Sequence, residues 1–482
     1  MNHTSNNMTL VALLRAPVAL ASIGFITVFI WIAVSRVGYP FELEWLEGLC
    51  CDHVNRVLKG DPLYVEPSLD FAPAVYTPMY YWCAAAVARV TGPGMLPLRL
   101  VSFAATLICY VCIARIVWVE TKSRLAAVCG AGVYAAMYNI TMTWYDLGRV
   151  DSLALAFSAL AVVCAQQARN PLGFACAGTC IVLATATKQT SVIMIIPVAL
   201  IAARHSRLAL SVLVITALCG VCALFMALDW ASGGWFMFYC FELPSKHAID
   251  YGVAKHYLQY DIGYVLWPTL VLIALWVYRG SRTVVPAAVA ITLVIQSYAA
   301  RAHTGAFVNV LMPAYLGLSI LAGTSFAVMT SHGKISAIVG CIAMLTQFGW
   351  LTQHYVPRTW IPSVEDAANG NRMVNALQAM PGRVYVPMHG YLLGLAGKEG
   401  NAHWQALADI ERMGSDSRLT RLHQQCQAVV GGQLFTVIVS DIAMPAFDKH
   451  WIIESRLLGN SLFSPCSPVG YRGPDCVYKR RP

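Results

Sequence analysis

Eleven apolar stretches, each close to the length of a membrane-crossing helix, constrain this chain more than any other feature. They are residues 17–35, 97–118, 125–143, 152–168, 172–187, 189–203, 208–228, 262–278, 284–300, 306–328 and 335–353. A helix needs about 20 apolar residues to cross the hydrocarbon core. Only 12% of the residues are charged, against about 25% in a soluble domain. We therefore expect an all-α polytopic membrane protein with about eleven transmembrane helices, and the alternation typical of barrel strands is missing.

A twelfth apolar stretch, residues 76–90, decides the topology. It carries Arg89 and has only about fifteen residues, fewer than the usual minimum near 17. If it does not cross, the most basic loops share one side, which the positive-inside rule makes cytoplasmic. These loops contain Lys122, Arg124, Arg169, Arg204, Arg207, Arg279, Arg282 and Lys334. We therefore expect residues 44–59 and 76–90 to form two helices lying in the outer interface.

From residue 356 onward the composition becomes that of a soluble domain. Residues 364–380 predict a helix, and residues 382–387 and 433–441 predict short strands. We expect a transmembrane catalytic domain over 1–355 and a small α/β domain over 356–482, which eleven crossings from a cytoplasmic N-terminus place outside. Near the end, Cys466 and Cys476 flank a turn rich in Pro and Gly. The sequence leaves open whether they form a disulfide or stay unpaired.

Three carboxylates stand within eight residues, directly after the first apolar stretch. They are Glu42, Glu44 and Glu47 in FELEWLEG. Acids at a membrane boundary are costly unless they have a function. A carboxylate within reach of a hydroxyl accepts its proton as the oxygen attacks carbon. The alternative is that these acids merely face headgroup water, but three of them so close together beside Trp45 favour a catalytic base.

A second set of charges is expected at the same outer depth. In WYDLGRVDSL, Asp151 alone is explained as a helix N-cap, but capping does not explain Arg149. An arginine is suited to bind the phosphate of a lipid donor. Lys188, Arg301 and His303 also fall at this depth. One such cation is usually a snorkelling group, whereas several together predict a basic pocket for an anionic donor.

Further polar residues are candidates for substrate binding. Asp70 and Tyr76 lie in the first outer loop, and Asn309 lies at the outer end of the stretch 306–328. The aromatic loop 229–261 is expected to lie in the interface. Motifs for nucleotide binding or zinc proteolysis are missing, no metal-type spacing of Cys and His occurs, and the scattered Lys and Arg indicate no nucleic-acid partner. Energy must then arrive with the substrate.

The order of seven motifs resembles a known family. The succession ELEWLEG, KGDPLY, YTPMYYW, GPGMLPLRLVS, GRVDSL, TKQT and TGAFVNVLMP resembles the GT-C membrane glycosyltransferases, in the bacterial branch similar to protein O-mannosyltransferases and aminoarabinose transferases (glycosyltransferase family 39-like). The resemblance covers about residues 17–330. It implies inverting transfer of one sugar from a polyprenyl-phosphate donor to a hydroxyl of a cell-surface glycan, lipid or protein, at the periplasmic face of the bacterial inner membrane.

The resemblance also implies roles for individual residues. The general base of the first loop corresponds to Glu44, with Glu47 as the second choice, and the acid of the second loop corresponds to Asp151. Family members bind a divalent cation near the first-loop acids in some cases, and this sequence neither requires nor excludes one. 

Two other functions suit a polytopic chain: a transporter or flippase of lipid-linked sugars, and a non-catalytic membrane assembly protein. Transporters often show internal repeats with broken helices, and we find no such self-similarity. The acids are also expected at helix ends and not at mid-helix. We therefore favour a glycosyltransferase over both.

Overall fold

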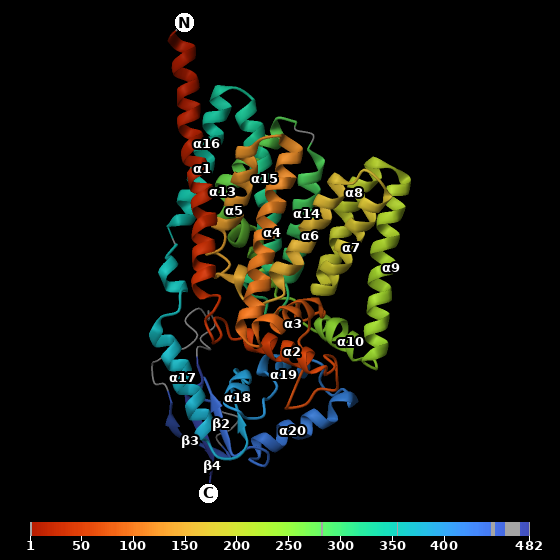
Figure 1. The fold of residues 1–482 in the computed structure, drawn as a ribbon, viewed down its shortest axis with the longest axis vertical. Helices are drawn as coiled ribbons and strands as arrows, with labels where there is room; N and C mark the ends of the chain where they lie inside the picture. The colour runs from red at the N-terminus through yellow and green to blue at the C-terminus, as the bar shows by residue number, and fades with distance from the viewer. Residues whose placement is uncertain (1, 281–282, 354, 445–448, 458–472, 482) are drawn as a thin grey trace.

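The computed structural model describes residues 2–280, 283–353, 355–444, 449–457 and 473–481. A bundle of long helices stands on a smaller domain that contains the sheet (Figure 1). The N-terminus and the C-terminus lie at opposite ends of the molecule. The predicted combination of a helical membrane domain with a small C-terminal α/β domain is therefore confirmed, while the division at residue 356 stays a prediction.

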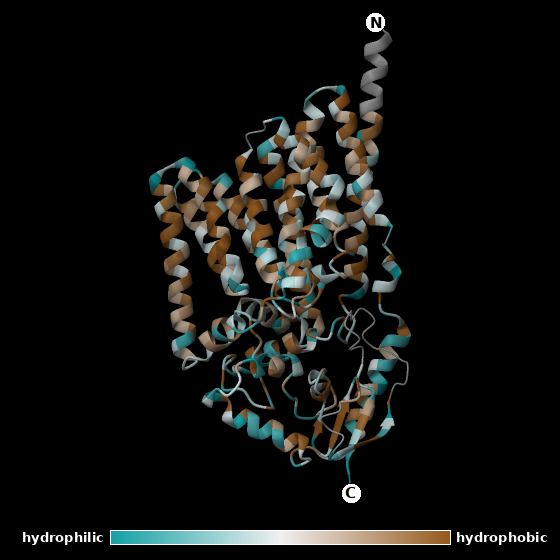
Figure 2. Ribbon diagram, turned by 180° about the vertical axis from the view of Figure 1, so that it is seen from behind, coloured by the Kyte–Doolittle hydropathy of each residue, from teal (hydrophilic) through white to brown (hydrophobic). Residues whose placement is uncertain are grey.

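The bundle contains apolar helices of two lengths. Seven helices of the described chain are long and apolar enough to cross a membrane, and four shorter apolar helices accompany them. In chain order the bundle helices are α1 (Asn2–Arg36), α4 (Met95–Thr121), α5 (Arg124–Ala136), α6 (Asp151–Gln167), α7 (Pro171–Thr187), α8 (Ile195–His205), α9 (Arg207–Ala231), α13 (Val265–Tyr278), α14 (Val284–Arg301), α15 (Met312–Ser331) and α16 (Lys334–Thr352). Each predicted apolar stretch overlaps one of them. Hydrophobic colour covers their sides and hydrophilic colour gathers at the connections (Figure 2).

One predicted helix is much shorter than its apolar stretch. The stretch 125–143 predicts a crossing, but α5 ends at Ala136. The chain then turns back through Met142 and Thr143, which have positive φ angles of 50° and 60°. Arg36, at the end of α1, donates a hydrogen bond to the Thr143 carbonyl oxygen at 2.8 Å. This buried contact favours the turn over further helix, and the hydropathy of the segment carries no sign of it.

Helix α15 forms the centre of the bundle. Its most apolar window is completely buried, and it packs against α4, α5, α13, α14 and α16. Glycines permit the closest approach, because a Cβ atom at Gly323 would meet the Ala126 carbonyl oxygen of α5 at 2.7 Å. Small residues at such contacts are the usual means by which membrane helices pack.

Two short helices lie across the end of the bundle, between it and the C-terminal domain (Figure 1). They are α2 (Glu47–Lys59) and α3 (Met79–Thr91), each 13 residues long. Helix α2 is capped by Gly60, whose left-handed φ of 79° suits a glycine. The sequence predicted helices at both places, and their length is too short for a crossing.

The C-terminal domain packs helices against a four-stranded sheet. Its helices are α17 (Val364–Ala379), α18 (Tyr391–Leu395), α19 (Trp404–Glu411) and α20 (Thr420–Val430), and its strands are β1 (Val384–Tyr385), β2 (Val437–Ser440), β3 (Trp451–Arg456) and β4 (Cys476–Arg480). The strand order is β1-β2-β4-β3, with β1 parallel to β2 and the other pairs antiparallel. The predicted helix and both predicted strands are confirmed. Cys476 is buried, whereas Cys466 lies outside the described residues.

The contact between α1 and α5 gives a prediction about stability. A Cβ atom at Gly132 would lie 2.6 Å from the Ser22 Cα atom, and overpacking of this kind typically destabilises by about 1–3 kcal/mol. We expect Gly132→Ala to lower the thermal unfolding midpoint of the purified protein in detergent. Gly24→Ala is the matched control on α1, since a Cβ atom there meets nothing within 4 Å. Equal midpoints for the two variants would contradict this packing.

Candidate active site

The three acids of the first loop are buried. The relative exposure of Glu42, Glu44 and Glu47 is 0%, 1% and 0%. The turn that follows α1 carries Glu42 and Glu44, and Glu47 is the first residue of α2, where the bundle meets the C-terminal domain. Burial excludes the alternative that these acids face headgroup water. A buried carboxylate needs partners, and the three acids differ in how many they have.

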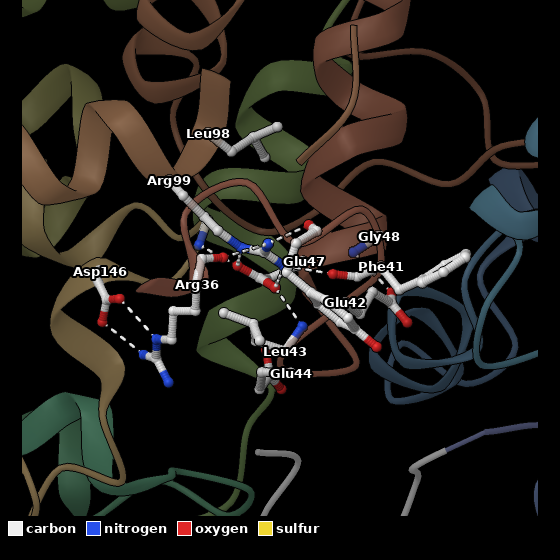
Figure 3. Close-up of polar contacts among 12 residues, drawn as sticks. Arg36, Phe41, Glu42, Leu43, Glu44, Glu47, Gly48, Leu98, Arg99 and Asp146 are labelled. Atoms are coloured by element: carbon white, nitrogen blue, oxygen red, sulfur yellow. Dashed lines mark hydrogen bonds and ion pairs between the residues drawn. The ribbon is translucent and has the colours of Figure 1, made fainter. Parts of the chain in front are cut away.

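Glu47 is fully engaged by partners from the bundle. Its Oε2 atom lies 2.7 Å from Arg99 Nη2, and Arg99 Nε lies 3.0 Å from Oε1 (Figure 3). The backbone N–H groups of Gly148 and Leu43 donate to the same carboxylate at 2.6 and 2.7 Å. Burial raises the pKa of Glu47, but Arg99 outweighs it and holds the pKa below its ordinary value. Four donors make Glu47 an anchor of the turn.

Glu44 keeps unused hydrogen-bonding capacity. Its Oε2 atom accepts from the Leu46 N–H at 3.1 Å and lies 3.6 Å from Arg149 Nη1. Its Oε1 atom is buried with no hydrogen-bond partner among the described residues. Burial raises the pKa of Glu44 to about 7, although the Arg149 charge opposes it. A general base works best with a pKa near the operating pH, so Glu44 suits this role better than Glu47.

Asp151 gathers partners from distant parts of the chain. Lys188 Nζ lies 2.7 Å from its Oδ1 atom, Asn309 donates to the same oxygen at 3.1 Å, and Trp144 Nε1 donates to Oδ2 at 3.0 Å. Trp144 belongs to the 3-10 turn η1 (Trp144–Asp146), and Asn309 belongs to η5 (Val308–Leu311). Asp151 is the first residue of α6, and the cap position is Val150. Capping therefore does not explain Asp151.

Arg149 contacts Glu44 and links it to Asp151 indirectly, through Trp144. It lies within reach of Glu44, and its guanidinium carbon is 5.4 Å from the centre of the Trp144 ring. Its Nε and Nη1 atoms are buried and make no hydrogen bond within the described chain. Tyr76 lies beside the second cation, with Lys188 Nζ 5.8 Å from its ring centre. We call Glu44, Arg149, Asp151, Lys188 and Asn309 the acid–base cluster.

Three predicted residues lie elsewhere. Arg301 pairs with Asp261 of the π-helical segment η4 (Tyr257–Tyr264), at 2.9 Å. His303 is exposed, and Asp70 forms an ion pair with Arg383 of the C-terminal domain. Among the described contacts, none joins these three to the acid–base cluster. Their roles in binding donor or substrate stay predictions.

Several buried partners were missed in the sequence. Arg36 forms an ion pair with Asp146 at 2.6 Å, and Tyr138 donates to the same carboxylate at 2.6 Å. His389 of the C-terminal domain bonds to Glu42. Arg99 stands inside the apolar stretch 97–118, where an arginine is a signal of function or pairing. Nothing local in the sequence points to Arg36 or His389.

Two of the three first-loop acids, Glu42 and Glu47, are not available to a divalent cation. Glu47 is occupied by Arg99, and Glu42 is occupied by His389 and by the Gly48 N–H. Within the described residues, no group of three or more His, Cys, Asp or Glu side chains could hold a metal ion. Cationic side chains stand where a metal would otherwise balance the acids.

A cleft opens between α2 and the C-terminal domain. Its volume is about 810 Å³, and its lining includes Asp52, Arg56, Phe71, Lys398 and His403. The His403 ring lies 5.1 Å from the Trp45 ring, and Trp45 is the neighbour of Glu44 in sequence. One end of this cleft therefore approaches the turn that carries Glu44.

Comparisons with known proteins agree with this architecture. Residues 74–231 match the family model of dolichyl-phosphate-mannose-protein mannosyltransferases, and no curated protein matches the chain in sequence. The fold is similar to that of ArnT from Cupriavidus metallidurans bound to undecaprenyl phosphate, with 13% identity, a TM-score of 0.63, and coverage of 95% of this chain and 97% of that chain. The apo state of ArnT from the same organism is 12% identical, with a TM-score of 0.58 and coverage of 95% of this chain and 98% of that chain.

A third solved structure is more distant. The Archaeoglobus fulgidus oligosaccharyltransferase in complex with zinc and sulfate is 10% identical, with a TM-score of 0.51 and coverage of 89% of this chain and 68% of that chain. The resemblance to the GT-C glycosyltransferases that the sequence motifs suggested is confirmed by the family match and by the fold.

Proposed function

We propose that this chain, which resembles the GT-C membrane glycosyltransferases in fold and in its matched segment, moves one sugar from a polyprenyl-phosphate donor to a hydroxyl acceptor with inversion. One observation carries the proposal. Glu44 is a buried carboxylate beside Arg149. Glu44 Oε1 and the Nε and Nη1 atoms of Arg149 have no hydrogen-bond partner in the part of the chain that the structure describes. A base and a phosphate-binding cation thus stand together, each with capacity for a substrate.

The chemistry follows from these two groups. Glu44 takes the proton of the acceptor hydroxyl while the hydroxyl oxygen attacks the anomeric carbon of the sugar. The phosphate leaves from the opposite face of the sugar, so the configuration inverts. Arg149 and Lys188 bind the phosphate oxygens and stabilise the charge that grows on them. Asp151, 2.7 Å from Lys188, holds that cation in place.

The donor class is supported by the related fold. ArnT was solved bound to undecaprenyl phosphate, and its fold covers 95% of this chain. Lys188 is the most exposed charged member of the acid–base cluster, with 13% of its side chain accessible, so it is the group that an incoming phosphate meets first. The acceptor, a cell-surface glycan, lipid or protein, approaches Glu44 along the cleft that His403 lines.

The site is proposed to face the periplasm of a bacterial inner membrane. The connections from α8 to α9 and from α15 to α16 lie at the end of the bundle away from the C-terminal domain (Figure 1), and they carry Arg204, Arg207 and Lys334. The positive-inside rule makes that end cytoplasmic. The acid–base cluster and the C-terminal domain then lie outside, where a lipid-linked sugar is available.

The role of Glu44 is tested by Glu44→Gln, which keeps the shape of the side chain but removes the base. We expect transfer of labelled sugar from a polyprenyl-phosphate donor in membranes to fall by about 10²-fold or more. Glu365→Gln, at an exposed position on α17, is the control and should transfer normally. Normal transfer by Glu44→Gln would show that another group is the base.

The pKa of Glu44 gives a second expectation. Burial raises this pKa to about 7, and only the carboxylate form accepts a proton. Transfer by the wild-type protein should therefore be low at acidic pH and rise as the pH increases through about 7. The rate of transfer at saturating donor, measured across the pH range, checks this. A rate that stays constant from about pH 5 to about pH 8, a range that spans the titration of Glu44, would contradict Glu44 as the base.

The proposed topology is tested by fusion to alkaline phosphatase, which folds only where its disulfides form. Fusions after Thr121 or Arg169 should be inactive, because both positions follow crossings that end in the cytoplasm. A fusion after Gly92, between α3 and α4, should be active. The reverse pattern would place the acid–base cluster on the cytoplasmic side and contradict the use of a periplasmic donor.

A further inference from the structure

A histidine of the C-terminal domain is buried against the turn that carries Glu44. His389, just before α18, has no exposed surface. Its Nδ1 atom bonds to Glu42 Oε2, and its Nε2 atom lies 3.0 Å from Asp441 Oδ2, at the end of β2. Between two ionised carboxylates both ring nitrogens donate, which only the protonated imidazolium can do. Burial raises the pKa of Glu42 to about 8, while His389 and the Gly48 N–H favour its ionised form. Burial lowers the pKa of His389, but Asp441 and Glu42 raise it above its ordinary value.

Glu42 is also hydrogen-bonded to Gly48 at the far end of the turn and to Tyr391 of the C-terminal domain. Its Oε1 atom accepts a hydrogen bond from the Gly48 N–H at 2.8 Å, and its own N–H donates to the Tyr391 hydroxyl at 3.2 Å. A Cβ atom at Gly48 would collide with Glu42 and Tyr391, so the turn closes tightly only around glycine. Glu44 stands in the middle of the segment that these bonds close.

An exposed ion pair also crosses the same boundary. Arg421 of α20 faces Glu66 at 3.8 Å, with 66% and 45% of their side chains exposed. An exposed ion pair contributes little to stability, because water screens both charges. Burying a histidine between two acids is expensive unless every partner is placed. His389 has both partners placed, Glu42 from the first loop and Asp441 from its own domain.

We infer that His389 is a positioning residue for the Glu44 base, which it holds through Glu42, so that the C-terminal domain completes the active site. This inference rests on the proposed function. The imidazolium donates to Glu42, Glu42 fixes Gly48, and the closed turn keeps Glu44 next to Arg149. A displacement of about 1 Å at a reacting group lowers rates by up to roughly 10²-fold.

Two amide substitutions at His389 test its two hydrogen bonds one at a time. The Nδ2 atom of asparagine occupies the place of His Nδ1, so His389→Asn retains a donor toward Glu42. The Nε2 atom of glutamine reaches the place of His Nε2, so His389→Gln retains a donor toward Asp441 only. We expect His389→Gln to lose about tenfold or more in kcat while its KM for the polyprenyl-phosphate sugar stays near the wild-type value, and His389→Asn to keep most of the rate. Arg421→Gln is the control for a lost contact between the domains and should match the wild type.

A second measurement does not depend on catalysis. Backbone hydrogen exchange of the peptide covering residues 41–48, in the purified full-length protein, should be faster in His389→Gln than in His389→Asn. Equal loss of kcat in both variants together with equal exchange, or wild-type kcat in His389→Gln, would overturn the positioning role. Absence of transfer by the wild-type protein would instead overturn the proposed function, and the exchange comparison would still decide whether His389 holds the turn.

Discussion

Every charge that this fold buries has to be paired, and that requirement shapes the first loop. Arg36 with Asp146 and Arg99 with Glu47 are buried ion pairs at 2.6 and 2.7 Å. Removing one member of such a pair is strongly destabilising, because it leaves an unpaired charge in a medium of low dielectric constant. The pairs therefore fix where the chain runs after α1 and where α4 meets it.

The pair of Glu44 and Arg149 departs from this pattern in an informative way. The closest atoms of the two side chains are 3.6 Å apart. Glu44 Oε1 and the Nε and Nη1 atoms of Arg149 have no hydrogen-bond partner among the described residues. Buried polar groups without partners are rare, and each needs an explanation. A purely structural ion pair would be more stable with these groups hydrogen-bonded, whereas a site that binds a hydroxyl and a phosphate needs them free for the substrate.

Much of this arrangement could be predicted from the sequence, because hydropathy and charge placement are local properties. The bundle helices follow from apolar length, and shared depth at helix ends is compatible with the pair of Asp151 and Lys188. The same depth also predicted Arg301, which pairs with Asp261 instead. The early end of α5 could not be predicted, since it depends on Arg36 reaching the Thr143 carbonyl. Nor could the partner of Glu42, because His389 is 347 residues away and only the packing of the two domains brings them together.

The two domains fix the base from opposite sides. Arg99 holds Glu47 from the bundle, and His389 holds Glu42 from the C-terminal domain, so the residues flanking Glu44 are both immobilised. Glu44 consequently needs few bonds of its own to keep its place, and its Oε1 atom is left for a substrate. A catalytic group placed by its neighbours in this way stays both precise and reactive, since the hydrogen bonds that orient it do not consume the lone pair that it must offer.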